Sequence, residues 1–265
     1  MFGSCERLFL LLLIRTMFLA WKTAALRSQK SAPQVPTGQR VYAIGDVHGR
    51  ADLLEALLDR IDIDVKRRPI AHSIQVFLGD YIDRGPHSRQ VIDLLIAQRR
   101  RRKSVFLKGN HELCAAQALK DPSALSEWKR NGGISTLLSY GLTPLGRQDL
   151  KSDREVAVAF RDAMPESHRR FIESLALSFT CGDFFFAHAG VRPGVPLQRQ
   201  CPQDLLWIRE DFLFHEENFG KVIVHGHTPV IQPEIRPNRI NIDTGAYATG
   251  QLTCLVLEGD QMIFL

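Results

Sequence analysis

The sequence predicts an α/β fold in which mixed β-sheets are flanked by helices. Three observations predict this class. Strand-like and helix-like stretches alternate between residues 41 and 106, as they do in successive βαβ units with right-handed crossovers. Residues 113–176 carry helical patterns and no long apolar strand. Strand-like stretches return after residue 177, and two of them contain the turn signals CGD and EGD, which are typical of antiparallel hairpins.

The first predicted elements alternate strictly in type. Residues 41–44 are a short apolar run and predict a strand, and residues 50–61 carry leucines at helical spacing and predict an amphipathic helix. The order repeats with a strand at 73–80, a helix at 88–103 and a strand at 104–110. Strands that follow one another through helical crossovers usually pair in parallel. We therefore expect a sheet that is partly parallel.

The predicted helical insertion, residues 113–176, interrupts the succession of strands. Its helical stretches are separated by turn signals at the glycine pair Gly132-Gly133 and at Tyr140-Gly141. Insertions at strand ends often set specificity, so we expect this segment to shape substrate access. The remaining predicted strands lie within residues 177–190, 221–228, 239–245 and 251–265.

Length and composition are those of a globular protein with its own core. The chain has 265 residues, of which 45% are hydrophobic, so it can bury a sizeable core without disulfides. Its formal net charge of +5 suits an acidic substrate but is too small to indicate nucleic acid, which is not expected as a partner. Five scattered cysteines without a C-x-x-C motif indicate a reducing cytoplasm.

Residues 1–38 are predicted to precede the folded domain, which would comprise residues 39–265. Residues 28–38 are polar, carry proline and glycine, and read as a linker. The apolar and basic segment 7–27 has an uncharged run too short to span a membrane. Three alternatives remain for it: an interfacial helix in peripheral contact with a membrane, a segment docked on the domain, or an extension before a true start at Met17. A cytoplasmic location is expected, with membrane association through this segment left open.

Polar, glycine-bearing turns follow the predicted strands. GDVHG at 45–49, GDYIDRG at 79–85 and GNHE at 109–112 follow the first three, and two later strands end in HAG and HGHT. Taken singly, each is an ordinary turn or helix cap. Ligands gather at the carboxyl ends of strands in open α/β sheets, so the side chains of these turns should converge. They are Asp46, His48, Asp80, Asp83, Asn110, His111, His188, His225 and His227.

A metal site explains why such a group would be assembled. Several carboxylates brought together without cations would repel one another and be costly to desolvate. Mixed Asp, His and Asn ligands without thiolate suit divalent manganese, iron or zinc. One carboxylate shared between two ligand groups would make a two-metal site. We therefore expect two divalent metal ions, with manganese as the first choice.

The five motifs resemble those of the phosphoprotein phosphatase family within the calcineurin-like metallophosphoesterases, most closely its bacterial and phage serine/threonine branch. They span residues 45–228. The resemblance implies a β-sandwich core flanked by helices, and a first metal ion held by Asp46 and His48 with Asp80 bridging to a second. The remaining ligands that it implies, all of the second ion, are Asn110, His188 and His227.

The resemblance also implies the catalytic roles. A hydroxide that bridges the two ions would attack phosphorus in line, and His111, oriented by Asp83, would protonate the leaving oxygen. Arg84 and Asn110 would bind the phosphate. A further phosphate-binding arginine is expected at Arg209, beside Trp207, with Arg192 as its nearest competitor. His225 falls where other members tolerate a residue that is not a ligand, and Asp243 is either an outer support of the metal site or a turn residue.

Three functions remain open at this point. The first is hydrolysis of phosphoserine or phosphothreonine in proteins, or of small phosphoesters. The alternative is a symmetrical bis(5'-nucleosyl)-tetraphosphatase, but such enzymes usually carry Gln where this chain has His48 and Asn where it has Asp83, which favours the first. A catalytically silent phospho-binding module is the third, and the complete set of expected ligands argues against it.

Overall fold

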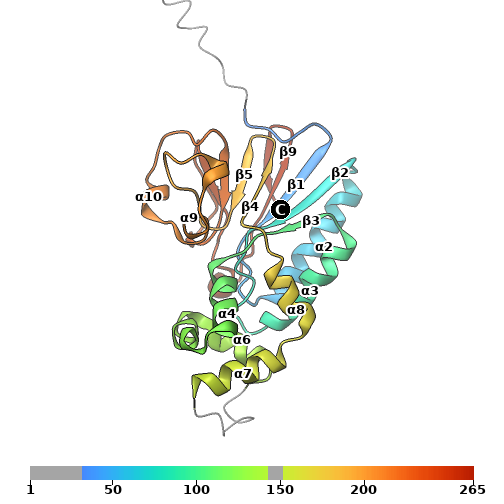
Figure 1. The fold of residues 1–265 in the computed structure, drawn as a ribbon. Helices are drawn as coiled ribbons and strands as arrows, with labels where there is room; N and C mark the ends of the chain where they lie inside the picture. The colour runs from blue at the N-terminus through green and yellow to red at the C-terminus, as the bar shows by residue number, and fades with distance from the viewer. Residues whose placement is uncertain (1–31, 143–151) are drawn as a thin grey trace, which may run out of the picture. The chain divides into compact units, whose positions relative to one another are not determined.

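Two five-stranded sheets, formed by the described residues, face each other at the centre of the fold (Figure 1). The computed structural model describes residues 32–142 and 152–265, so the predictions for segment 7–27 lie outside the described residues. The compact unit begins at Pro33, before the predicted boundary at Gln39. The reason is Val35, which is buried between the sheets and donates its backbone N–H to Gly259.

The first sheet has the order β10-β9-β1-β2-β3. Strands β1, β2 and β3 pair in parallel and β9 joins β1 in antiparallel orientation, so the sheet is partly parallel, as expected. The predicted EGD hairpin is β9-β10. The bounds are β1 Gln39–Ile44, β2 His72–Phe77, β3 Ser104–Phe106, β9 Cys254–Glu258 and β10 Gln261–Phe264.

The second sheet has the order β4-β5-β6-β8-β7 and is also mixed. Its β4-β5 pair is the predicted CGD hairpin, whereas β5, β6 and β8 run parallel. The bounds are β4 Ser178–Cys181, β5 Phe184–Ala187, β6 Val222–His225, β7 Glu234–Ile235 and β8 Arg239–Asn241. The α/β class with mixed sheets is therefore confirmed.

Alternation of side chains along the strands creates the layers. Val41 and Ala43 of β1 pack against Phe184 and Phe186 in the core between the sheets. Tyr42, on the other face of β1, joins the core under two amphipathic helices, because successive side chains point to opposite faces. These helices are α2 (Ala51–Arg67) and α3 (Ser88–Arg101).

The outer face of the second sheet is covered by short helices. Helices α9 (Pro202–Trp207) and α10 (Glu210–Leu213) lie beside this sheet (Figure 1). Their side chains Leu205 and Phe212 form one core cluster with Phe185 and Ile223. The 3₁₀ helix η3 (Leu197–Arg199) also belongs to this side, whereas α11 (Ala246–Thr249) packs Ala246 into the core under α2 and α3. The fold is thus a sandwich of two sheets with helices on both outer faces.

The described part of the segment between β3 and β4 is mostly helical, with an isolated parallel bridge between Leu107 and Ala176 near its ends. It includes α4 (Asn110–Lys120), α5 (Leu125–Trp128), α6 (Ile134–Ser139), α7 (Asp153–Ala163) and α8 (Glu166–Glu173). A 3₁₀ turn, η1 (Pro122–Ala124), precedes α5, and a π-helical turn, η2 (Lys129–Gly133), joins α5 to α6.

The predicted turn at the glycine pair Gly132-Gly133 falls where α5 gives way to α6, and Gly132 breaks the helical backbone there. The pair lies within η2, where Gly132 has φ +107° and its carbonyl accepts a hydrogen bond from the Arg84 backbone. A Cβ at Gly132 would lie 2.9 Å from Arg84 Cγ. The glycine therefore permits close approach of the insertion to the GDYIDRG loop, which local sequence cannot reveal.

Replacing Gly132 with Ala should destabilise the fold by about 2 kcal/mol, because positive φ strains an L-residue and the methyl group crowds Arg84. Urea unfolding measures the loss. The matched control is Gly141→Ala, where φ is +85° but no atom lies within 4 Å of the added Cβ. Only Gly132→Ala should also weaken orthophosphate binding, through Arg84; equal phosphate affinity in both variants would contradict the prediction.

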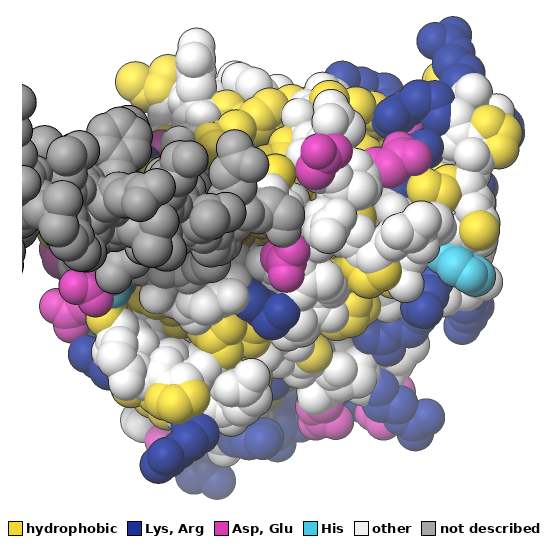
Figure 2. Space-filling model, turned by 90° about the horizontal axis from the view of Figure 1, so that it is seen from above, with side chains coloured by type: hydrophobic (Ala, Val, Ile, Leu, Met, Phe, Trp, Pro, Cys, Tyr) yellow, Lys and Arg dark blue, Asp and Glu magenta, His cyan; other side chains and the backbone are white. Residues whose placement is uncertain are grey.

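The described part of the chain contains no helix that is long and apolar enough to cross a membrane. Figure 2 shows the face seen from above Figure 1, where Lys and Arg side chains lie in small groups near Asp and Glu. Such interspersed charge is typical of a solvated surface rather than of a single-sign binding patch.

Candidate active site

The turns that follow β1, β2 and β3 meet at one edge of the first sheet. Glu112, at the start of α4, ties two of them together. Its buried carboxylate accepts hydrogen bonds from the backbone N–H groups of Asp80, Tyr81 and Gly109, at 2.8 to 2.9 Å. Burial and the nearby Asp80 raise the pKa of Glu112 to about 7, although these hydrogen bonds oppose the shift. The GNHE motif contains Glu112, but sequence analysis assigned it no role.

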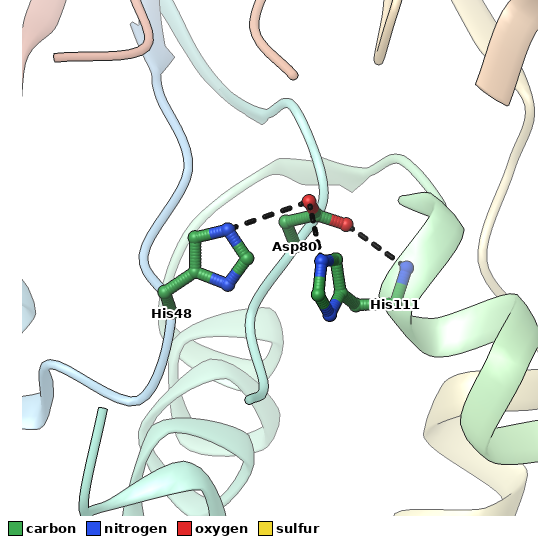
Figure 3. A group of neighbouring side chains, drawn as sticks. All are labelled: His48, Asp80 and His111. Carbon is green, nitrogen blue, oxygen red and sulfur yellow. Dashed lines mark hydrogen bonds and ion pairs between the residues drawn. The ribbon is translucent and has the colours of Figure 1, made fainter. Parts of the chain in front are cut away.

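Asp80 lies at the centre of the site and is buried. Figure 3 shows the rings of His48 and His111 directed at its carboxylate from the turn after β1 and the start of α4. Asp80 Oδ2 lies 3.5 Å from His48 Nε2 and 3.8 Å from His111 Nε2. Asp80 Oδ1 accepts the His111 backbone N–H at 3.1 Å. Burial raises the pKa of Asp80, but the surrounding histidines outweigh burial and the net shift is downward.

A second group lies on the other side of Asp80. His188 Nε2 is 3.4 Å from Asp80 Oδ1 and 2.9 Å from Asn110 Oδ1. His227 Nδ1 also lies 2.9 Å from Asn110 Oδ1. The ligand atoms of Asp80, His188 and His227 lie within 4.8 Å of one another, and so do those of His48, Asp80 and His111. Asp80 is therefore common to two groups that could each hold a metal ion.

The ring nitrogens show that a cation fits between these groups. His48 Nδ1 donates to the Ile82 carbonyl at 2.9 Å and His188 Nδ1 donates to the Leu78 carbonyl at 3.0 Å. Each Nε2 then carries a lone pair that faces carboxylate or amide oxygen. Burial lowers the pKa of His48 to about 3 and also lowers that of His188. Both rings therefore stay neutral, and protonation does not relieve the repulsion between the Nε2 lone pairs and the oxygens that they face. Metal-bound histidines commonly donate their other N–H to a backbone carbonyl in this way.

Asp46 and His227 add unpartnered atoms to the same site. Asp46 Oδ2 accepts the His227 backbone N–H at 3.0 Å, but buried Asp46 Oδ1 and His227 Nε2 have no hydrogen-bond partner. Burial raises the pKa of Asp46 well above its usual range, and Asp243 and Asp80 raise it further. Burial also lowers the pKa of His227 to about 2, which keeps its imidazole neutral. The donor set therefore fits two divalent cations.

Backbone strain marks the same residues. Within the described chain, every non-glycine residue with positive φ belongs to the predicted site: His48, Asp80, Asp83, Arg84 and His227. Non-glycine residues in this region of φ/ψ space cost free energy and persist where surrounding structure holds them. The neighbouring Gly109 is required by close approach, because a Cβ there would lie 2.0 Å from Asp80 Oδ1.

His111 and Asp83 form a buried pair. Asp83 Oδ2 accepts the Nδ1–H of His111 at 2.7 Å, so Nε2 of His111 is directed toward Asp80 and Arg84. Burial lowers the pKa of His111, but Asp80 and Asp83 raise it more strongly, to about 8. A histidine of this kind is protonated near neutral pH and can act as a general acid.

Two residues of the insertion support Asp83, and sequence analysis missed both. Trp128 Nε1 donates to Asp83 Oδ2 at 2.8 Å, and Thr136 Oγ1 donates to Asp83 Oδ1 at 2.6 Å. Both side chains are buried. The segment WKRNGGIST contains them, but its sequence indicated only helices and a turn.

Replacing Thr136 with Val should destabilise the protein by about 2 kcal/mol, because a buried carboxylate loses a donor at nearly constant side-chain volume. Unfolding in urea measures this loss, and kcat should fall as well because Asp83 no longer holds His111 in place. Thr180→Val on β4 is the control, since Thr180 is exposed and such changes stay within about 0.5 kcal/mol. Equal stability of the two variants would rule out this role for Thr136.

A cavity of about 470 Å³ opens over the pair, and its lining includes Arg84, Asn110, His111 and Arg209. Tyr247, a further residue without a predicted role, packs its ring 4.8 Å from the Arg84 guanidinium. A larger cavity of about 870 Å³ lies among α4, α7 and α8, but its described lining contains none of the predicted site residues.

The structure also bears on the residues whose roles were left open by the sequence. Arg209 lines the site cavity, whereas Arg192 forms ion pairs with Asp204 and Asp211. His225 is buried against the Phe212 ring, at 4.9 Å between ring centroids. Asp243 accepts the Gly245 backbone N–H at 2.9 Å, as a turn residue does, and it also lies near Asp46.

The sandwich and the Asp, His and Asn cluster at its strand ends define a metal-dependent phosphoester hydrolase. The sequence profile of the calcineurin-like phosphoesterase family matches residues 39–254. The chain belongs to this family. The fold confirms the expectation drawn from the motifs, whereas the narrower assignment to the serine/threonine phosphatase branch remains a prediction.

Proteins named as bis(5'-nucleosyl)-tetraphosphatases are among those similar to this chain. The chain is 28% identical to the asymmetrical bis(5'-nucleosyl)-tetraphosphatase PrpE of Halalkalibacterium halodurans, over 80% of this chain and 87% of that protein. It is 30% identical to the protein of the same name from Bacillus velezensis, over 79% and 86%. The solved structure of a candidate diadenosine tetraphosphatase has a TM-score of 0.60 at 19% identity and covers 88% of this chain and 97% of that one, a likeness of fold.

Proposed function

We propose that this protein is a metal-dependent bis(5'-nucleosyl)-tetraphosphatase. The observation that carries the proposal is the pair of ligand groups around Asp80 beneath a cavity lined by arginines. The names of the relatives support the dinucleotide substrate over the phosphoprotein predicted first. They also favour asymmetrical cleavage, into a nucleoside triphosphate and a monophosphate, over the symmetrical cleavage of the predicted alternative.

The chain's own residues would divide the work as follows. Asp46, His48, Asp80, Asn110, His188 and His227 would hold two divalent ions. When bound, these ions would neutralise charge on the phosphate and supply an acidified water for attack on phosphorus.

Arg84 would bind phosphate oxygens through its planar guanidinium, and its packing on Tyr247 limits the motion of that group. Arg209, which lies between α9 and α10, would also bind phosphate. His111 Nε2 would hold the proton for the leaving oxygen, and Asp83 would keep the imidazole oriented.

A serine/threonine protein phosphatase is the second candidate, and one observation favours it. The leaving group of a phosphoserine is an alkoxide, which needs a proton far more than the phosphate that leaves a tetraphosphate. The complete pair of His111 and Asp83, supported by Trp128 and Thr136, fits that demand.

Comparison of substrates tests the two. The manganese-loaded protein should hydrolyse diadenosine tetraphosphate with kcat/KM at least about 100-fold above that for phosphoserine and phosphothreonine peptides, a difference of some 2.7 kcal/mol in transition-state stabilisation. Chromatography of the products should show ATP and AMP rather than ADP alone. A preference for the peptides would overturn the proposal in favour of the second candidate.

A further inference from the structure

The cavity above the metal ligands carries more positive charge than one phosphate group requires. Three arginines line it, Arg84, Arg130 and Arg209, together with the rings of Trp207 and Tyr247. None of its described lining residues is acidic. Cations that share a cavity without carboxylates favour an anionic ligand.

Arg130 is the one arginine of this lining that has no part in the catalytic roles proposed above. It is exposed, and its side chain forms no hydrogen bond or ion pair within the described residues, whereas Arg84 lies against Tyr247 and Arg209 contacts Thr228. It comes from η2, in the helical insertion. That turn is held against the GDYIDRG loop, because the Gly132 carbonyl accepts the Arg84 N–H at 3.2 Å. Arg130 therefore stands on a positioned turn beside the phosphate-binding arginine.

We propose that Arg130 binds a phosphate group adjacent to the one under attack, so that the cavity selects ligands with at least two linked phosphates. The proposal rests on the proposed function, since it explains how a site built for one phosphoester would select a polyphosphate chain. The planar fork of arginine suits phosphate oxygens at a cavity edge. The chain could come from a nucleotide or from inorganic polyphosphate, which share this chemistry.

Direct binding tests the proposal without any need for turnover. Calorimetry on the manganese-loaded protein, with the same free manganese in cell and syringe, would use orthophosphate and imidodiphosphate, which carries two linked phosphates and resists hydrolysis. The wild-type protein should bind imidodiphosphate at least about tenfold more tightly than orthophosphate, the effect of one charge-assisted contact. Arg130→Ala should reduce this ratio to about threefold or less.

Arg100→Ala is the matched control. Arg100 is also an exposed arginine on a helix, but it lies on α3 and outside the cavity lining, so the binding ratio should stay at the wild-type value. Arg130→Lys, which keeps the charge and loses the fork, should give an intermediate ratio. A third ligand, adenosine 5'-(β,γ-imido)triphosphate, separates the sources: tighter binding than that of imidodiphosphate indicates a nucleotide, and equal binding indicates inorganic polyphosphate.

An unchanged ratio in Arg130→Ala, or a wild-type ratio near one, would overturn the inference and leave Arg130 as an ordinary solvated cation. Failure of the proposed function looks different. If the wild-type protein fails to hydrolyse diadenosine tetraphosphate and yet loses its imidodiphosphate preference in Arg130→Ala, the inference stands for another polyphosphate ligand. If it hydrolyses the tetraphosphate while the ratio is insensitive to Arg130, only the inference is lost.

Discussion

Replacing Asp80 with Asn is expected to lower kcat by about 10³-fold or more and to reduce the bound divalent metal. Asp80 is the only residue common to both groups of ligand atoms within the described chain. Its two oxygens face different partners, with Oδ2 toward His48 and Oδ1 toward His188. An amide offers one neutral oxygen in place of two charged ones, so one group loses its anionic ligand. Metal catalysis is worth several kcal/mol, and each 1.36 kcal/mol is tenfold in rate.

Metal analysis of the purified variant and its kcat on p-nitrophenyl phosphate measure this effect. Asp62→Asn serves as the control, because Asp62 pairs with Arg102 on the surface, between α2 and α3, and takes no part in the site. Its metal content and kcat should match those of the wild-type protein. An Asp80→Asn variant that keeps two equivalents of metal and retains kcat within tenfold would refute the two-metal arrangement.

Replacing His111 with Asn should lower kcat by roughly 10²- to 10⁴-fold on substrates with poor leaving groups, the range expected for loss of a general acid. The hydrogen bond from Nδ1 to Asp83 directs Nε2 toward Asp80 and Arg84, and the neighbouring carboxylates raise the pKa of His111 to about 8. The defect should shrink on p-nitrophenyl phosphate, because nitrophenolate leaves without protonation. Bound metal should stay at the wild-type level.

The dependence of kcat on the leaving group distinguishes a general acid at His111 from the alternative that the geometry allows, a metal ligand at the same position. His111 Nε2 lies 3.8 Å from Asp80 Oδ2, in the same ligand group as His48. If His111 were a metal ligand, His111→Asn would lose metal, and the defect would be equal for good and poor leaving groups. His72→Asn is the matched control, because His72 is exposed at the start of β2. Its rate and metal content should be unchanged.

Much of the fold was predictable because its signals are local. Apolar runs that end in glycine-bearing turns predicted β1, β2 and β3, and the CGD and EGD turns predicted the hairpins. The predicted ligands lie together, since parallel strands that follow one another must end at the same edge of a sheet. The turn at the glycine pair Gly132-Gly133 was also predicted, but the close approach of Gly132 to Arg84 was not, because contact between distant segments leaves no local signal.

The sequence by itself determined the class of fold, the succession of strands along the chain and the chemical types of the predicted ligands. Only the tertiary structure decided how they are supported: Glu112 across two turns, Trp128 and Thr136 on Asp83, and Arg130 at the cavity edge. Trp128 and Thr136 are 45 and 53 residues from Asp83 along the chain. The hydrogen bond between His227 and Asp46 joins residues that are 181 positions apart. Periodicity reports which face of an element is apolar, whereas the partner of a buried polar atom depends on how distant elements pack.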